Sequence, residues 1–574
     1  MSQRKIKKLK KLDKILLKDN DVAVEPFGCK EKSFFEIIRN NKIFIILLIF
    51  GTFLLYLNGM SGAFVSDDYA TIPNNPSVTD VTNTMGDVFS FVTFSNSVLA
   101  NIFGVGSPTP YHIYSLIIYL IICVLVFVFT YLLLDKNMAY VSSIIFAVMP
   151  IHVEAVTWIS GKPYIMTTIF MMAALCNFLL YLKTKQKKYL YLLVVFEVLA
   201  LLTEKVRFMS FFLILIGYVL TYWKRHNINI GKFLLTMSGL LIVSLVVIYP
   251  YIMNRVNIVN GEINGSGSVF YDPFFQYPTA MAKYLQLLFV PTDLTLYHTM
   301  YVFPIWLNWA ILLSYLSMLI YFYFKNKKYF FALAFIFAAA APSMAPVKVS
   351  WLVAERYMFL GSLGFAIFLG LIILDLSKYF KILPGLLFIS LMILSMIRVW
   401  TRNIDWQTNH NLWVNTCQVS PNSHNAWNNI GDDYDKLKDY QNAIKGFTQS
   451  TIVKPNYADA YHNRANIFYK IGRLDLARES YNTALTFNPS LYQTYMSLIQ
   501  IDLNERNGEQ AMIHSSKLLE ANPNDPQSRY VVGVVLAQFG QTDKAKEMFK
   551  SILVNYPNYT QARRALLELD AGRS

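Results

Sequence analysis

The chain contains little cysteine and little charge for its length. Its 574 residues include only four cysteines, Cys29, Cys123, Cys176 and Cys417, whose spacing matches neither a zinc site nor a disulfide framework. Charged residues make up 15% of the chain and hydrophobic residues 55%, which excludes an ordinary water-soluble globular protein. The sequence also lacks a glycine-rich phosphate loop that would cradle a nucleotide. Most of the chain is therefore predicted to lie in lipid.

Positive charge is concentrated in the N-terminal tail. The net charge is +15, from 51 basic and 36 acidic residues. Residues 1–20 hold eight basic side chains and two acidic ones, whereas residues 421–574 hold 17 basic and 16 acidic ones. No single folded segment gathers the charge, so a nucleic-acid partner is not predicted. The basic tail precedes an apolar run at 43–59, which predicts a cytoplasmic tail at residues 1–42 followed by a retained signal anchor.

Apolar windows long enough to cross a bilayer as helices recur from residue 43 to residue 400. They predict an all-α, polytopic transmembrane domain over residues 43–400 with about eleven spans. A further apolar stretch, 278–290, is short and bounded by Pro278 and Pro291, so it is expected to lie in the interface or to enter the membrane partway. The predicted spans are 43–59, 112–134, 138–156, 163–182, 189–203, 207–223, 232–253, 305–324, 329–346, 356–375 and 382–399.

The distribution of lysine predicts how the domain is oriented. With the basic tail inside, the lysine-bearing short loops all fall on the cytoplasmic side. These loops lie at 183–188, 224–232, 325–328 and 378–381. An odd number of spans then places the segments 60–111 and 254–304, and everything after residue 400, outside the cytoplasm. The membrane is expected to be a prokaryotic plasma membrane or the endoplasmic reticulum, with these segments extracytoplasmic or lumenal.

The C-terminal part, residues 401–574, is an internal repeat. Proline recurs every 34 residues at 421, 455, 489, 523 and 557, and alanine at 443, 477, 511 and 545. This period predicts an α-solenoid of about four tetratricopeptide repeats, with proline ending each second helix and a final cap helix at 559–570.

Such a solenoid presents a concave face, which predicts a groove for an acceptor protein or peptide. Repeat spacing alone places Asn428, His462 and Tyr530 on that face. The alternative is that the array only packs against the membrane domain.

Two adjacent carboxylates, Asp67 and Asp68, closely follow the first predicted span. Carboxylates at a membrane boundary are costly beside lipid unless they meet water, cations or substrate. In isolation, a solvated loop end or a helix cap explains the pair as well as a catalytic role does.

Further polar groups are predicted at the same membrane boundary. For any one of them, a snorkelling side chain or a helix-terminal charge is the alternative. Together they place carboxylates and cations at one face, which favours a functional site. The candidates are His152, Glu154, Lys162, Lys205, Lys348, Glu355 and Arg356.

Four motifs occur in order along the chain and together carry a family resemblance. They are Phe64-Val65-Ser66-Asp67-Asp68, residues 146–156 followed by Gly161-Lys162, residues 355–365, and a junction with Arg402-Asn403, Trp406, Leu412-Trp413, Thr416 and Pro421-Asn422-Ser423. In this combination the chain resembles the transmembrane and tetratricopeptide-repeat O-mannosyltransferase family. The resemblance extends over about residues 43–570. That family is similar to the C superfamily of glycosyltransferases, whose members take sugar from a polyprenyl phosphate outside the cytoplasm.

The resemblance implies that Asp67 or Asp68 handles an acceptor hydroxyl. We expect a single displacement, in which a Ser or Thr hydroxyl attacks the anomeric carbon and inverts it. Cations would stabilise the phosphate that leaves, and the candidates are Lys162, Lys205, Lys348 and Arg356. Glu154 is a candidate second acid, Glu355 a further site candidate, and His152 a structural hydrogen-bonding residue or a substrate contact. The scheme requires no cofactor and no metal, since the lipid-linked sugar is a co-substrate.

Two alternatives stay open at this point. One is a ligase or polymerase that joins a lipid-linked glycan to another carbohydrate or lipid. The other is a non-catalytic membrane scaffold that recruits proteins through its repeats. Replacing Asp67 or Asp68 separates the scaffold from the enzymes, because a scaffold keeps its full function without these carboxylates.

Overall fold

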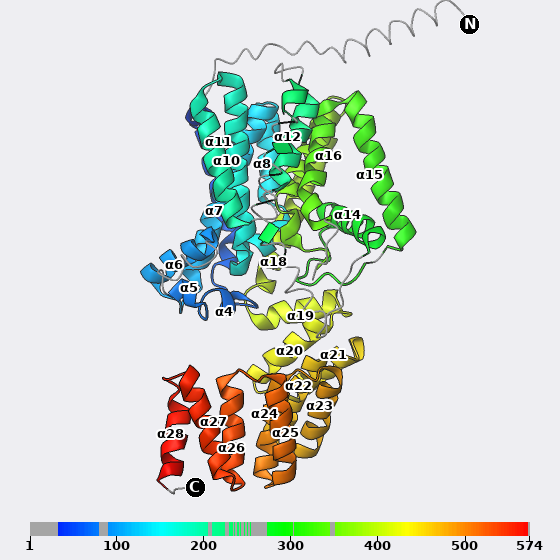
Figure 1. The fold of residues 1–574 in the computed structure, drawn as a ribbon. Coiled ribbons are helices and arrows are strands. Elements are labelled where there is room, and N and C mark those ends of the chain that lie inside the picture. The colour runs from blue at the N-terminus through cyan, green and yellow to red at the C-terminus, as the bar shows by residue number, and fades with distance from the viewer. Residues whose placement is uncertain are drawn as a thin grey trace, which may run out of the picture. The chain divides into compact units, whose positions relative to one another are not determined.

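The computed structural model describes most of the chain as helices joined by short connections (Figure 1). The described residues are 33–79, 90–204, 209–223, 229–233, parts of 235–253, 272–301, 303–344 and 351–571. Within them every regular element is helical, which confirms the all-α prediction. The described residues divide into two compact units, one within 33–415 and one within 416–571.

In the described part of the first unit, five helices are long and apolar enough to cross a membrane. A sixth span results if α8, η3 and α9 (Lys136–Ala147 with Pro150–Thr157) are counted as one, although this pair is bent by 57°. The five are α3 with η1 (Lys42–Gly59), α7 (Thr109–Leu133), η4 with α10 (Ile159–Thr184), α15 (Ile305–Lys325) and α18 (Leu383–Asp405).

The predicted count of about eleven spans is therefore higher than the described helices support by length and composition. Several predicted spans correspond to helices of 14 to 17 residues, and 232–253 lies largely outside the described residues. Apolar windows overlook the points at which the backbone breaks, such as Pro150 and the η6 turn (Glu355–Met358). The shorter helices are α11 (Lys187–Thr203), α12 (Met209–Tyr222), α16 (Lys327–Ala340, followed by η5, Ala341–Met344) and α17 (Gly361–Leu376).

The helix α14 (Pro273–Phe289) occupies the stretch predicted to lie in the interface. It begins five residues before Pro278, so this proline lies inside the helix and does not bound it. The Asp272 side chain caps the helix by accepting a hydrogen bond from the Phe274 main-chain N–H at 2.9 Å. The helix is not among the candidate spans.

Short helices connect these elements. They are α2 (Phe34–Asn40), α4 (Asp68–Thr71), α5 (Pro76–Thr79), α6 (Phe91–Phe103) and α19 (Asn409–Val419).

The second unit contains the predicted repeat array. Four antiparallel helix pairs are followed by a single helix, which confirms the predicted four repeats and the cap helix. The pairs are α20 (His424–Lys436) with α21 (Tyr440–Val453), α22 (Ala458–Lys470) with α23 (Leu474–Phe487), α24 (Tyr492–Asn504) with α25 (Gly508–Ala521), and α26 (Pro526–Gln538) with α27 (Thr542–Asn555); the cap is α28 (Thr560–Asp570).

A hydrogen bond recurs with the 34-residue period of the prolines. In four places a side chain in the first helix of a repeat, or in the cap, donates to the carbonyl of the proline six residues before it. The donors differ chemically, being an indole, a phenol and two guanidinium groups, so the position and not the residue type is repeated. The pairs are Trp427 with Pro421, Tyr461 with Pro455, Arg529 with Pro523, and Arg563 with Pro557, at 2.8, 3.1, 2.8 and 2.5 Å.

Small residues let the paired helices approach closely. Ala443, on α21, is completely buried. A Cβ at Gly446 would lie 2.9 Å from the Cα of Gly431 and 3.1 Å from the carbonyl oxygen of Trp427. Both neighbours are main-chain atoms, which cannot move aside without displacing a helix.

Gly446→Val is therefore expected to destabilise the array by about 1–3 kcal/mol, through steric overlap with α20. Chemical unfolding of the full chain in detergent measures the change. Lys445→Val is the matched control, since this neighbouring side chain is exposed and the substitution carries the same β-branched cost to the helix. Equal effects of the two substitutions would show that helix propensity, and not close approach, sets the cost.

Candidate active site

The turn formed by Val65, Ser66, Asp67 and Asp68, here called the acid turn, separates its two carboxylates. Ser66 has a φ of +52°, a left-handed conformation that is uncommon for a residue other than glycine. After this turn the Asp67 side chain is exposed, whereas Asp68, the first residue of α4, is completely buried. The adjacent carboxylates thus occupy different environments.

Asp68 joins the first loop to the segment that leads into α10. Its Oδ1 accepts hydrogen bonds from the main-chain N–H of Ser160 at 2.8 Å and from the Ser160 hydroxyl at 2.6 Å. Its Oδ2 accepts from the Val65 N–H at 3.0 Å. Burial raises the pKa of Asp68 to about 6, although these hydrogen bonds and the nearby Lys162 oppose the rise.

Lys162 lies two residues beyond Ser160 and is completely buried. Its Nζ donates to the Asn96 side-chain oxygen of α6 at 2.6 Å and lies over the rings of Tyr111 and Tyr114, 5.2 and 5.3 Å from their centroids. No carboxylate in the described part of the chain lies within ion-pair distance of Nζ, so neutral oxygen and aromatic faces are its immediate neighbours.

Glu154 and Arg356 form a buried ion pair between segments 202 residues apart. The main-chain N–H of Arg356 donates to Glu154 Oε2 at 2.8 Å, and its guanidinium group donates to Oε1. The guanidinium carbon also lies 5.2 Å from the Trp158 ring centroid and 5.0 Å from that of Tyr357. The charge of Arg356 is therefore compensated within the protein.

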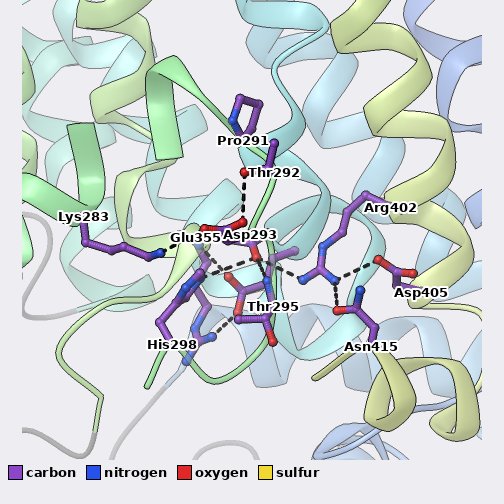
Figure 2. Close-up of polar contacts among 12 residues, drawn as sticks. Lys283, Pro291, Thr292, Asp293, Thr295, His298, Glu355, Arg402, Asp405 and Asn415 are labelled. Atoms are coloured by element: carbon purple, nitrogen blue, oxygen red, sulfur yellow. Dashed lines mark hydrogen bonds and ion pairs between the residues drawn. The ribbon is translucent and has the colours of Figure 1, made fainter. Parts of the chain in front are cut away.

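Glu355 is the centre of a second buried network (Figure 2). Its Oε1 accepts from the Thr295 N–H at 2.5 Å and from the Arg402 Nη2 at 3.0 Å. The other guanidinium nitrogen of Arg402 reaches Asp405 and Asn415, each at 3.1 Å. Burial raises the pKa of Glu355, and its ion pair with Arg402 opposes that rise. This network ties α18 to η6 and to the loop after α14.

Lys283 and His298 extend this network, His298 with its Nε2 3.7 Å from Glu355 Oε1, and neither residue was predicted from the sequence. The Lys283 Nζ lies 3.7 Å from Asp293, whose carboxylate also accepts from the Gln286 amide at 3.0 Å. Burial lowers the pKa of His298 to about 3, so its ring is neutral near pH 7. A single lysine inside the apolar stretch 278–290 was the available signal for Lys283.

His152 is buried between α7 and α17. One ring nitrogen, Nδ1, lies 2.8 Å from the Tyr119 hydroxyl, and the other, Nε2, lies 2.6 Å from the Ser362 hydroxyl. Both nitrogens are thus occupied by protein groups. The remaining two candidates, Lys205 and Lys348, lie outside the described residues.

The three predicted groove residues belong to first helices of the repeats. The Asn428 side-chain oxygen accepts from the Asn463 amide at 3.1 Å, across neighbouring repeats. The Nδ1 of His462 lies 2.9 Å from the Thr494 hydroxyl. Tyr530 packs against the rings of Phe549 and Tyr559, with centroids 5.7 and 6.0 Å away.

The structure brings some of the predicted residues together and leaves others apart. Asp68 and Lys162 meet through Ser160, and Glu154 meets Arg356, whereas Glu355 pairs with Arg402 instead. In the described part of the chain no three His, Cys, Asp or Glu side chains gather as a metal site. The acid turn and the segment Ser160 to Lys162 together offer the exposed carboxylate of Asp67, the buried carboxylate of Asp68 and the buried ammonium group of Lys162.

These features define the class of protein. The apolar helices and the repeat units together make it a helical membrane protein that carries a tetratricopeptide-repeat array. Residues 91–249 match the family model described as dolichyl-phosphate-mannose-protein mannosyltransferase. Tetratricopeptide-repeat models match residues 424–457, 458–491 and 527–559.

Relatives with curated descriptions match most of this chain. The chain is 24% identical over 506 residues to the protein O-mannosyl-transferase TMTC3 of Homo sapiens, a match that covers 78% of this chain and 55% of the relative. It is 26% identical over 462 residues to the protein O-mannosyl-transferase F38B6.6 of Caenorhabditis elegans, covering 72% and 64%. The chain thus spans between about half and two thirds of the length of these relatives. The matches confirm its resemblance to the transmembrane and tetratricopeptide-repeat O-mannosyltransferases.

A solved structure also matches part of the chain. The tetratricopeptide-repeat protein YrrB, described as having an unusual peptide-binding site, is 16% identical with a TM-score of 0.25. The match covers 28% of this chain and 83% of that protein.

Arg402→Met is expected to lower the free energy of unfolding by about 3–5 kcal/mol, because it leaves Glu355 buried without its cation. Chemical unfolding of the full chain in detergent measures the loss. Arg398→Met, one helical turn earlier, is the matched control. Arg398 donates to the main-chain carbonyls of Pro291 and Thr292 and acts on Glu355 only through its charge, without a hydrogen bond, so its loss is expected to cost only about 1 kcal/mol. If both variants lose the same amount, the uncompensated carboxylate is not the cause.

Proposed function

We propose that this chain is an integral membrane glycosyltransferase that transfers a sugar, mannose in the first instance, from a polyprenyl phosphate to Ser or Thr hydroxyls of proteins. The observation that carries the proposal is the meeting of the acid turn with the segment Ser160 to Lys162, through the hydrogen bonds of Asp68. This arrangement supports a base and a cation at one place. The resemblance to O-mannosyltransferases supports the reaction class and the sugar.

In this mechanism Asp67 is the general base. Its side chain is exposed, so it is free to accept the proton of an incoming hydroxyl. Asp68 already accepts three hydrogen bonds, so its part is to hold the turn in place. The hydroxyl oxygen forms a bond to the anomeric carbon as the bond to the phosphate oxygen breaks, and the anomeric configuration inverts.

Lys162 is the first choice for stabilising the phosphate that leaves. A buried ammonium group surrounded by neutral oxygen and aromatic rings gains from a nearby anion. Arg356 is a weaker choice, because Glu154 already compensates its charge. Lys205 and Lys348 stay candidates for the same role, as do Glu154, Glu355 and His152 for supporting ones.

The proposal also includes the binding site of the acceptor protein and the side of the membrane on which each part of the chain lies. We propose that the repeat array engages the acceptor protein, with Asn428, His462 and Tyr530 on the binding face. We also propose a cytoplasmic N-terminus, which the lysine-bearing loops support, and an extracytoplasmic or lumenal repeat array, which requires in addition an odd number of spans. The scheme needs no metal or other cofactor.

The direct test supplies the purified full chain with radiolabelled polyprenyl-phosphate mannose and a denatured extract of extracytoplasmic proteins. Transfer of label to protein is expected for the wild type and is expected to fall about 10²- to 10⁴-fold in Asp67→Asn, which removes the base. Asp68→Asn is expected to lose less activity, because it disturbs only the position of the turn. Asp272→Asn is the matched control, since asparagine also caps a helix.

Each alternative has its own outcome in this assay. Label that moves to a glycan or a lipid instead of protein would identify a ligase or polymerase. Absence of transfer from every lipid-linked sugar tried, with partner binding retained in both Asp variants, would identify a scaffold. Transfer from a different lipid-linked sugar would keep the mechanism and correct the donor.

The pH dependence of transfer should follow Asp68. Its pKa is raised from 3.8 to about 6 by burial, so the carboxylate gains a proton as the pH falls through about 6. A protonated Asp68 cannot accept all three hydrogen bonds, so transfer is expected to fall below that pH. The pKa of Asp68 is higher in the folded chain than in the unfolded chain, so its ionisation as the pH rises from about 4 to about 6 lowers the free energy of unfolding. Acidification through the same range restores that stability. Loss of activity from this group should therefore be reversible, as measured by rates at pH 7 after incubation at pH 5.

A further inference from the structure

The acid turn is held in a conformation that its sequence does not favour. Ser66 has a φ of +52° in a non-glycine residue. Such a conformation persists only when surrounding contacts impose it. Since Asp67 directly follows Ser66, the direction of its carboxylate depends on whatever imposes this backbone angle.

The contacts come from the chain just after α18. The main-chain N–H of Ser66 donates to the Asn409 side-chain oxygen at 2.8 Å, across 343 residues of sequence. The N–H of Ala63 donates to the carbonyl of Gln407 at 2.8 Å, and the Gln407 amide donates to the carbonyl of Asn58 at 2.9 Å. Two residues of one short segment therefore hold both ends of the loop that contains the strained position.

On its other side the turn is held through Asp68. The hydrogen bonds from Ser160 and Val65 fix the buried carboxylate. The Asn409 side chain fixes Ser66, the residue that lies between these contacts. Without it, Ser66 is free to relax to a negative φ, which turns the Asp67 carboxylate away from its present direction.

We infer that Asn409 is a positioning residue, whose side-chain oxygen keeps Ser66 in the left-handed conformation and so directs the Asp67 carboxylate toward the acceptor hydroxyl. The inference rests on the proposed function of Asp67. It assigns a role in the reaction to a residue of the junction that lies far from the acid turn in sequence.

Four variants of the full chain test this role, together with a control. Asn409→Ala removes the acceptor of the Ser66 N–H, and Asn409→Asp keeps an oxygen at the same place. Ser66→Gly removes the strain, because glycine adopts a φ near +52° without a Cβ clash. The fourth variant combines Ser66→Gly with Asn409→Ala. Asn411→Ala is the matched control, since Asn411 is a partly exposed asparagine on the same first turn of α19 and donates to the carbonyl of Ile404, away from the acid turn.

Transfer rates give the first readout. Asn409→Ala is expected to lower kcat about five- to tenfold with little change in KM for the donor, as for one lost hydrogen bond that orients a base. Asn409→Asp and Asn411→Ala should stay within about twofold of the wild type. In the Ser66→Gly background, the loss of kcat caused by Asn409→Ala should shrink to about twofold. Glycine adopts the left-handed conformation without the hydrogen bond from residue 66 to Asn409. A purely structural role for Asn409 predicts the same loss in both backgrounds, and that result would overturn the inference.

Hydrogen exchange gives a second readout that does not depend on activity. Peptides covering residues 61–68 should exchange faster in Asn409→Ala than in the wild type or in Asn411→Ala, because the Ser66 N–H loses its acceptor. Unchanged exchange would also overturn the inference. If exchange changes as expected but the wild type transfers no sugar, Asn409 holds the turn and it is the proposed function that fails.

Discussion

Buried charge is the constraint on which the first unit depends. Glu154 and Glu355 are completely buried carboxylates in a chain that is predominantly apolar, and each is paired with an arginine. Removing one partner of such a pair costs about 3–5 kcal/mol, which is a large part of the stability of a typical domain. Each pair joins segments distant in sequence, so pairing the charges also decides which helices meet. The backbone breaks at Pro150 and at η6 place these carboxylates where their arginines can reach them.

The candidate site has a different electrostatic arrangement from these pairs. Lys162 is as buried as the paired arginines, yet its nearest hydrogen-bond partner is the neutral Asn96 side chain. Asp68 lies nearby through Ser160 but uses its oxygens on other donors. A buried cation without a carboxylate at ion-pair distance is costly for folding, and it is an arrangement that a reaction with an anionic leaving group uses.

Much of the second unit could be predicted from sequence, and less of the first. The 34-residue period of Pro421 and its equivalents predicts each helix pair, because a solenoid repeats one local unit and its contacts are close in sequence. The membrane helices follow no such period. Apolar windows merge helices with the turns between them, as at Pro150, where the chain bends by 57°. Pro278 likewise lies inside α14, which begins five residues earlier with Asp272 as its cap.

The sequence by itself determined that two carboxylates stand at the end of the first span, that cations and further acids follow at similar boundaries, and that a repeat array lies beyond them. Only the tertiary structure decided that Asp67 is exposed and Asp68 buried, and that Glu355 pairs with Arg402 and not with a neighbour. The physical reason is that burial and pairing depend on contacts across hundreds of residues. The 343-residue separation of Ser66 and Asn409 leaves no local pattern from which such a contact could be predicted.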